Sequence, residues 1–169
     1  KQHRPTRDLL HVSGLLLAGG TLDVFVCHFP SRSGGAKESE PYRLYVAHIL
    51  RTEVDSIMNI RSHPQAIIMG DFNDYPTNQS ILKILKAEAP PVKTNDLAST
   101  TDSANASTVT PSSLKLYHLL ARKAKSKNFG SYKFRGEWGL LDHLIVSGTL
   151  LNQSNHFFTS EEKANVCLL

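Results

Sequence analysis

Two apolar segments, over residues 9–18 and 21–29, open the interpretable part of the chain. Gly19 and Gly20 separate them, and because both glycines can take a positive φ, the pair predicts a β-hairpin. Side chains along the second segment should alternate between two faces of a strand. One face carries Leu22, Val24, Val26 and His28, and the other carries Asp23, Phe25, Cys27 and Phe29.

The hydrophobic period then changes from two to about 3.6, which predicts an amphipathic helix over 41–61. Its apolar stripe consists of Val46, Ile49, Leu50, Val54, Ile57 and Met58. A short apolar run over 65–69 is typical of a buried strand. A second helix is expected over 78–87, with Ile81, Leu82 and Leu85 directed inward.

The later part of the chain begins with a polar stretch, 90–113, that predicts a long flexible surface loop. A helix is expected over 114–122, followed by strands over 131–138 and 141–147. Strands and helices therefore alternate only in part. This pattern favours an α+β (mixed α/β) fold in a single domain over a regular parallel sheet.

Composition limits the class of protein further. The chain has 169 residues, of which 40% are hydrophobic and 20% charged, so a packed core is feasible. No apolar run approaches the length needed to span a bilayer. Two cysteines exclude a disulfide scaffold and a four-cysteine zinc site. A formal charge of +4 allows an anionic ligand without indicating one, and nothing points to a compartment or a protein partner.

The strongest local signal for chemistry is the sequence Gly-Asp-Phe-Asn at 70–73, directly after the expected buried strand. If the backbone stays extended there, Asp71 and Asn73 point the same way while Phe72 enters the core. A carboxylate and a carboxamide suit Mg²⁺, or a water molecule directed at phosphorus. The alternative is an ordinary turn in which both side chains satisfy backbone donors.

His28 ends its strand just before a glycine-rich loop that carries Arg32. A histidine there can donate to a phosphoryl oxygen or hold a carboxylate, although a lone strand histidine is more often a hydrogen-bonded core or rim residue. Cys27 lies on the opposite face of the strand, so it cannot form a dyad with His28 and is expected to fill the core.

Asp142 lies within an apolar run, so we expect it to be buried beside a specific donor. By strand alternation His143 is not that donor. A structural salt bridge is one interpretation, and an acid that orients a histidine from elsewhere is the other. A basic stretch over 122–127 is typical of a solvated helix end, with nucleic-acid contact as the alternative.

Three motifs in this order resemble the endonuclease/exonuclease/phosphatase superfamily. They are His-Phe-Pro-Ser-Arg at 28–32, Gly-Asp-Phe-Asn at 70–73 and Trp-x-x-Leu-Asp-His at 138–143. The likeness spans most of the chain and is greatest to a bacterial branch with a His-Trp-Pro-Ser-Arg loop, where this chain has Phe29. It implies that residues 1–169 form part of a four-layer α/β/β/α sandwich and that Mg²⁺ or Mn²⁺ is the cofactor.

The resemblance also implies a role for each matching residue. Asp71 and Asn73 correspond to the pair that binds the metal or orients the attacking water. His28 corresponds to the histidine near the scissile phosphate, and Arg32 to a phosphate-binding residue. Asp142 corresponds to the acid that orients a catalytic histidine, and His143 is given no role.

The chain also departs from the family pattern, because the metal-binding Glu and an Asn on preceding strands and the closing Ser-Asp-His have no counterpart. We therefore expect a partial domain that is inactive alone, within a metal-dependent phosphodiesterase, nuclease or phosphatase. Its substrate is a phosphate ester, with nucleic acid and a small-molecule or lipid phosphodiester as alternatives. The alternative is a catalytically incomplete binding module with the same fold. A cysteine or serine hydrolase is a third, weaker interpretation.

Overall fold

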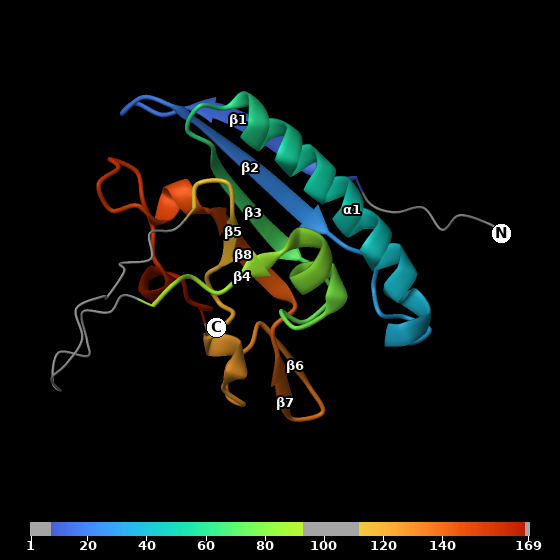
Figure 1. The fold of residues 1–169 in the computed structure, drawn as a ribbon. Coiled ribbons are helices and arrows are strands. Elements are labelled where there is room, and N and C mark those ends of the chain that lie inside the picture. Colours follow the sequence, from blue (N-terminus) through green and yellow to red (C-terminus); the bar gives the residue numbers. More distant parts are fainter. Residues whose placement is uncertain (1–7, 93–111, 168–169) are drawn as a thin grey trace, which may run out of the picture.

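The computed structural model describes residues 8–92 and 112–167, which form one large mixed sheet with helical cover (Figure 1). The strand order is β1-β2-β3-β8-β5-β4. The strands of this sheet are β1 (Leu10–Leu15), β2 (Thr21–His28), β3 (Gln65–Asp71), β4 (Ala87–Glu88), β5 (Leu116–His118) and β8 (Asp142–Ser147). A separate hairpin consists of β6 (Tyr132–Phe134) and β7 (Glu137–Gly139).

The opening hairpin is confirmed. β1 and β2 pair antiparallel from Leu10 opposite Val26 to Leu15 opposite Thr21. Gly19 and Gly20 both have φ of 88°, a conformation that glycine adopts without steric cost. β2 then pairs parallel with β3, and β3 pairs antiparallel with β8. The sheet is therefore mixed, and the α+β prediction is confirmed.

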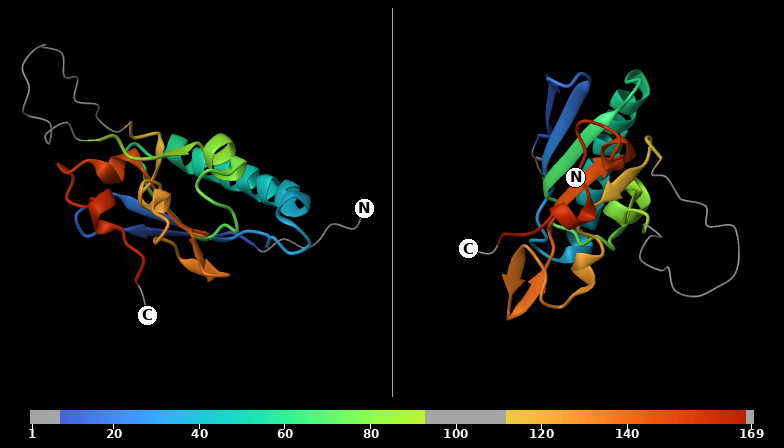
Figure 2. Two further views of the ribbon diagram at one scale, coloured as in Figure 1. Left: turned by 90° about the horizontal axis from the view of Figure 1, so that it is seen from below. Right: turned by 90° about the vertical axis from the view of Figure 1, so that its left-hand side faces the viewer.

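Helix α1 (Ala36–Ile60) lies along one face of the sheet (Figure 2). It begins five residues before the predicted start at Pro41, which the helix accommodates inside it. Its buried residues include Val46, Leu50, Val54 and Met58 of the predicted stripe. Between this helix and the sheet lies the main core.

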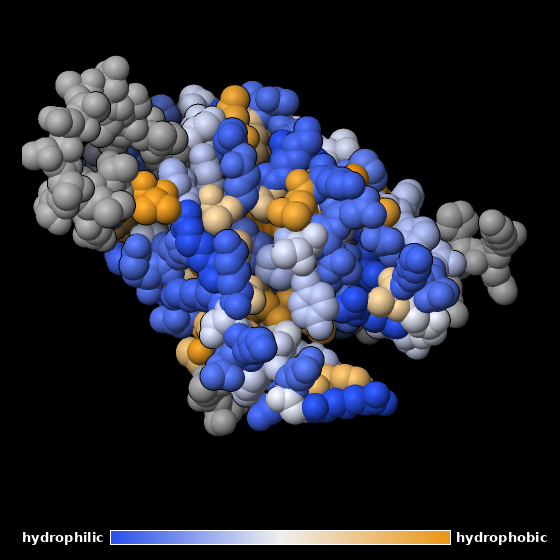
Figure 3. Space-filling view, turned by 60° about the horizontal axis from the view of Figure 1, so that its bottom comes forward, coloured by the Kyte–Doolittle hydropathy of each residue, from blue (hydrophilic) through white to orange (hydrophobic). Residues whose placement is uncertain are grey.

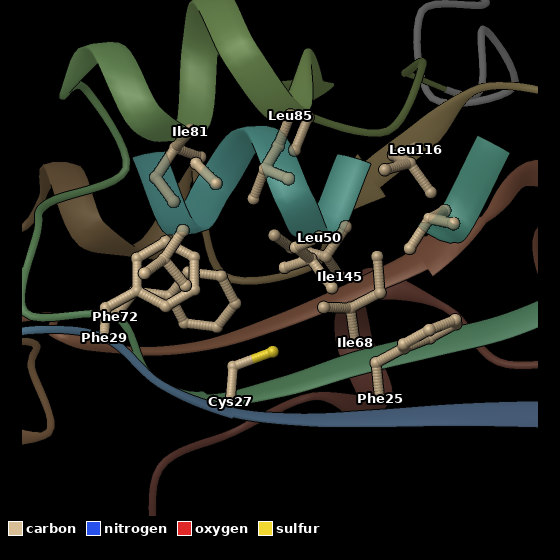
Figure 4. Packing of buried hydrophobic residues seen from close by; sticks show 14 of the residues in the cluster. Phe25, Cys27, Phe29, Leu50, Ile68, Phe72, Ile81, Leu85, Leu116 and Ile145 are labelled. Atoms are coloured by element: carbon tan, nitrogen blue, oxygen red, sulfur yellow. The ribbon is translucent and has the colours of Figure 1, made fainter. Parts of the chain in front are cut away.

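The main core interleaves one face of the sheet with α1 and with η1 (Ser80–Leu85), a single π-helical segment (Figure 4). Phe25, Cys27 and Ile68 rise from the strands toward the helical layer, where Leu50 and Ile81 meet them. The expected inward position of Leu82 is wrong, since its side chain is 51% exposed. A π-helix turns through fewer degrees per residue than an α-helix, so the α-helical spacing did not apply.

The predicted helix over 114–122 is also wrong. Its centre forms β5, which lies between β4 and β8 in the sheet. Only the 3₁₀ turn η3 (Lys123–Lys125) is helical near this segment. Pairing of β5 with β4 and β8 outweighs the local helix propensity, because it provides hydrogen-bond partners for the backbone N–H and C=O groups on both sides of this buried segment.

The opposite face of the sheet has a smaller cluster. Irregular segments and the 3₁₀ turns η4 (Gly148–Leu151) and η5 (Glu161–Lys163) lie near it, and Val146, Leu150 and Ala164 are buried there. Within the described ranges there is one large sheet and one helical layer, so the four-layer sandwich stays a prediction. Most of the loop predicted over 90–113 lies outside the described residues. None of the described helices combines the length and apolar character needed to cross a bilayer.

Candidate functional site

Three of the predicted site residues meet at one edge of the large sheet. His28 ends β2 and pairs in register with Asp71, the last residue of β3. Asp71 in turn pairs with Asp142, the first residue of β8. Residues 28, 71 and 142 are therefore successive neighbours across three strands, although they are far apart in the sequence.

All three side chains leave the sheet on the side away from α1. Phe25, Cys27 and Ile68 belong to the core beneath that helix, and strand alternation turns the side chains at 28 and 71 the other way. His28 Nε2 lies 3.8 Å from Asp71 Oδ2, and both side chains are partly exposed. The arrangement therefore puts a partly exposed histidine beside a partly exposed carboxylate.

Gly70 allows this close approach of β2 and β3. Its φ is +128°, and a Cβ atom at this position would lie 2.0 Å from the backbone oxygen of Cys27. Any larger residue would separate the two strands where Asp71 faces His28. The glycine of the Gly-Asp-Phe-Asn motif is thus a packing requirement.

The turn after β3 differs from the extended geometry expected from the sequence. The strand ends at Asp71, and Asn73 has φ of +49°, so strand alternation does not extend to it. Its backbone N–H donates to Asp71 Oδ1 (2.8 Å), and its side-chain Nδ2 donates to the carbonyl of Phe29 (3.0 Å). The turn interpretation is therefore correct for these atoms, while Asp71 Oδ2 faces His28. Phe72 is fully buried, as expected.

The expectation that Asp142 is buried is wrong. Its side chain is exposed, and its neighbour His143 is buried instead. Asp142 begins β8 at the rim of the sheet, where its carboxylate stays in water and its backbone N–H donates to Ser131 Oγ (3.1 Å). The apolar residues that follow Asp142 form the buried part of β8, whereas Asp142 lies at the exposed start of the strand.

Arg32 lies in the loop between β2 and α1. Its guanidinium carbon is 4.9 Å from the centroid of the Tyr75 ring, a cation–π contact that holds the side chain without neutralising its charge. Its predicted role in binding phosphate stays a prediction.

Cys27 fills the core, as expected. Its side chain is 3% exposed, and burial raises the pKa of its thiol to about 12. A thiol in this environment is not a nucleophile at neutral pH, because the thiolate is the reactive form. The cysteine-hydrolase interpretation therefore has no support at this residue.

Sequence reasoning missed a chain of buried hydrogen bonds beneath the site. The N–H of Leu120 donates to His118 Nδ1 (3.1 Å), which leaves the proton of this ring on Nε2. His118 Nε2 lies 2.7 Å from His143 Nδ1, and His143 Nε2 lies 2.9 Å from the carbonyl of Asp74. One neutral tautomer of each ring satisfies every contact, with each Nε2–H donating. The two histidines thereby tie β5 and β8 to the turn that carries Asp71 and Asn73.

Burial holds both histidines neutral. It lowers the pKa of His118 to about 3, with a further contribution from the neighbouring His143 ring. It lowers the pKa of His143 to about 4 against opposing effects of the Asp74 carbonyl and Asp142. Protonation of His143 would also put two donors face to face at the contact between the rings, and protonation of His118 would do so at its contact with the Leu120 N–H.

These lowered pKa values predict that the protein loses stability on mild acidification. An unfolded histidine binds a proton near pH 6.5, whereas these two stay neutral in the folded state to about pH 4. The free energy of unfolding should therefore be constant above pH 7 and fall below pH 6.5 by about 1.4 kcal/mol per pH unit for each histidine. Urea unfolding between pH 4.5 and 7.5 measures this slope. The variant His143→Gln should show a shallower slope and the exposed-site variant His48→Gln an unchanged one; equal slopes for all three proteins would contradict the assignment.

A buried ion pair supports the same turn. Arg43 Nε of α1 lies 2.7 Å from Asp74 Oδ1, and both side chains are almost completely buried. The contact is electrostatic rather than a well-aligned hydrogen bond. Ser80 Oγ donates to Asp74 Oδ2 (2.7 Å), and Arg43 also donates to Ser39 Oγ and to the carbonyl of Ala36. The sequence held one signal for it, because Arg43 lies three and seven residues before Val46 and Leu50 on the apolar stripe.

The donor atoms at this edge fit a hard divalent cation only in part. No group of three or more His, Cys, Asp or Glu side chains within the described ranges could enclose a metal. Asp71 and Asn73 nevertheless offer oxygen atoms, and the Asp71 and Asp142 carboxylates are direct cross-strand neighbours whose repulsion a cation would relieve. Mg²⁺ is commonly held by one or two carboxylates together with water and substrate phosphate. The site is therefore compatible with Mg²⁺ or Mn²⁺.

Comparison with known proteins gives a family-level match. The model of the Endonuclease/Exonuclease/phosphatase family matches residues 1–167. No curated protein has a matching sequence. Among solved structures, the chain is similar to the human Nocturnin catalytic domain with bound sulfate anion, at 15% identity and a TM-score of 0.46, over 85% of this chain and 48% of that one. The chain thus spans about half the length of that domain.

Proposed function

The chain belongs to the endonuclease/exonuclease/phosphatase family, and from that premise we propose that the full-length protein is a metal-dependent hydrolase of phosphate esters. The reaction is an in-line attack of water on phosphorus. The observation that carries the proposal is the register of His28, Asp71 and Asp142, which puts a histidine and two carboxylates side by side at an open sheet edge.

Each side chain has a role that its surroundings support. Asp71 orients the attacking water through Oδ2, because Oδ1 already accepts the N–H of Asn73. His28, 3.8 Å from that oxygen, holds the carboxylate or donates to a phosphoryl oxygen. Arg32 binds the phosphate, and its planar guanidinium suits two phosphate oxygens at once.

A divalent cation completes the proposal. Asp71 and the amide oxygen of Asn73 would hold Mg²⁺ or Mn²⁺, with Asp142 beside them. When bound, the ion would stabilise the negative charge that develops on the phosphoryl oxygens. In this scheme Asp142 also orients a catalytic histidine. His143, its neighbour in β8, points to the other face of the sheet and is not that histidine.

We expect chelation to abolish the activity of the full-length protein. The test is hydrolysis of bis-p-nitrophenyl phosphate in excess EDTA, followed by Mg²⁺ or Mn²⁺ in excess of the chelator. Activity should vanish and then return, because the carboxylates are themselves negative and only a cation can offset the charge that develops on the phosphoryl oxygens.

The same assay separates the proposal from its alternative. Activity that persists in EDTA would contradict metal dependence. A full-length, metal-loaded protein that cleaves neither phosphodiesters nor phosphomonoesters would favour a binding module with the same fold. We expect the 169-residue chain alone to be inactive in this assay.

A further inference from the structure

The β6–β7 hairpin projects from the body of the molecule next to the candidate site (Figure 1). It forms its own two-stranded sheet, and two residues separate the end of β7 from the start of β8 at Asp142. The side chains of Tyr132, Lys133, Phe134 and Arg135 are all exposed. Figure 3 shows apolar and hydrophilic side chains next to each other at the lower edge, where the hairpin projects.

The two faces of the hairpin carry different side chains. Lys133 pairs directly with Trp138, and its Nζ lies 5.3 Å from the centre of the indole ring. On the other face the rings of Tyr132 and Phe134 lie nearly parallel, with centroids 6.2 Å apart and an interplanar angle of 13°. They are 46% and 57% exposed, and the guanidinium carbon of Arg135 lies 5.2 Å from the centroid of the Phe134 ring.

Contacts join the aromatic face to the site. Tyr132 pairs with Gly139, and the Tyr75 ring lies so close to Gly139 that a Cβ there would be 2.9 Å from it. The Tyr75 ring also contacts the guanidinium of Arg32. Ser131, directly before the hairpin, accepts the N–H of Asp142. A line of aromatic rings and cations thus leads from the predicted phosphate-binding residue to the tip of the hairpin.

We propose that this hairpin binds single-stranded nucleic acid as the substrate of the neighbouring site, an inference that rests on the proposed phosphoesterase function. Bases stack on Tyr132 and Phe134, while Lys133, Arg135 and Arg32 contact phosphates. Exposed aromatic rings with interspersed cations are the arrangement that binds single strands without sequence preference, because every base has a stacking face.

Charge at the hairpin favours a polyanion. Lys125 and Lys127 are also exposed and precede it in the chain, whereas the acids are Glu137 within the hairpin and Asp142 after it. The turn itself is Arg135-Gly136, followed by Glu137. A bilayer would have to desolvate both charges at the tip, which is costly, so a membrane surface is the poorer fit.

The test measures binding of a fluorescein-labelled oligothymidylate of fifteen nucleotides by fluorescence anisotropy. EDTA is present so that the oligonucleotide is not hydrolysed. Tyr132→Ala/Phe134→Ala should weaken binding by on the order of tenfold or more, as expected when stacking surfaces are lost. Tyr132→Phe, which keeps the ring, should bind like the wild type. The matched control is Tyr45→Ala, because Tyr45 is 57% exposed on α1, away from the hairpin.

Several outcomes would overturn the proposal: no binding by the wild type, equal binding by the double alanine variant, or equal competition by heparin and by unlabelled oligothymidylate. Binding to phosphatidylserine vesicles in place of the oligonucleotide would assign the hairpin to a membrane. Because binding is measured without catalysis, a protein that binds the oligonucleotide but hydrolyses no phosphate ester would contradict the proposed function alone.

Discussion

Exchange of Asp71 for asparagine is expected to lower kcat/KM of the full-length protein for bis-p-nitrophenyl phosphate by about 10²–10⁴-fold, the range for loss of a positioned acid–base group. The carboxylate lies opposite His28 and next to Asp142, and its Oδ2 faces the site. Asparagine removes the negative charge but retains an oxygen that accepts the N–H of Asn73. The variant should therefore keep the turn and lose the chemistry.

Two measurements make this prediction specific. The circular dichroism spectrum and thermal midpoint of Asp71→Asn should match those of the wild type. The matched control is Asp55→Asn, because Asp55 is a half-exposed residue of α1 that pairs with Arg51 and should not affect activity. Wild-type kinetics for Asp71→Asn would remove Asp71 from the mechanism, and a lower thermal midpoint would attribute the loss to folding.

Replacement of Arg43 with methionine should reduce the free energy of unfolding by about 3–5 kcal/mol, the usual cost of leaving one partner of a buried ion pair uncompensated. Among the described residues, Asp74 would then keep only Ser80 as a side-chain partner, in a site with almost no access to water. The substitution should also disturb the candidate site, because the carbonyl of Asp74 accepts the Nε2–H of His143. Urea unfolding at pH 7.5 measures the change.

The controls separate burial from charge. Arg43→Met/Asp74→Asn should be more stable than Arg43→Met, because the second substitution removes the unpaired charge. Lys115→Met breaks the exposed Lys115–Glu88 pair and should leave stability almost unchanged. Wild-type stability for Arg43→Met would show that the pair contributes nothing net, and a less stable double variant would show that Asp74 acts through another contact.

The motifs predicted the candidate site better than the periodicity predicted its surroundings. His28, Asp71 and Asp142 end or begin strands, and residues at strand ends meet at one edge once those strands pair. Leu82 and the segment 114–122 were misassigned because short apolar runs fit more than one period, and the choice between them depends on partners distant in sequence.

The buried polar network was beyond sequence reasoning for a related reason. His118 and His143 are 25 residues apart, and only the pairing of β5 with β8 brings their rings to 2.7 Å. Arg43 and Asp74 belong to elements whose contact follows from packing of α1 on the sheet. A buried polar residue is stable only with its partner, so its role cannot be inferred before the partner is known.

The sequence by itself determined the opening hairpin, the long helix, the α+β class and the family, because these depend on local period, glycine geometry and motifs that local chemistry constrains. The tertiary structure decided which acid is buried, how Asn73 is held and which histidines are kept neutral. Those properties depend on solvent access and on contacts between distant strands, and burial is set by the whole sheet rather than by the apolar residues on either side.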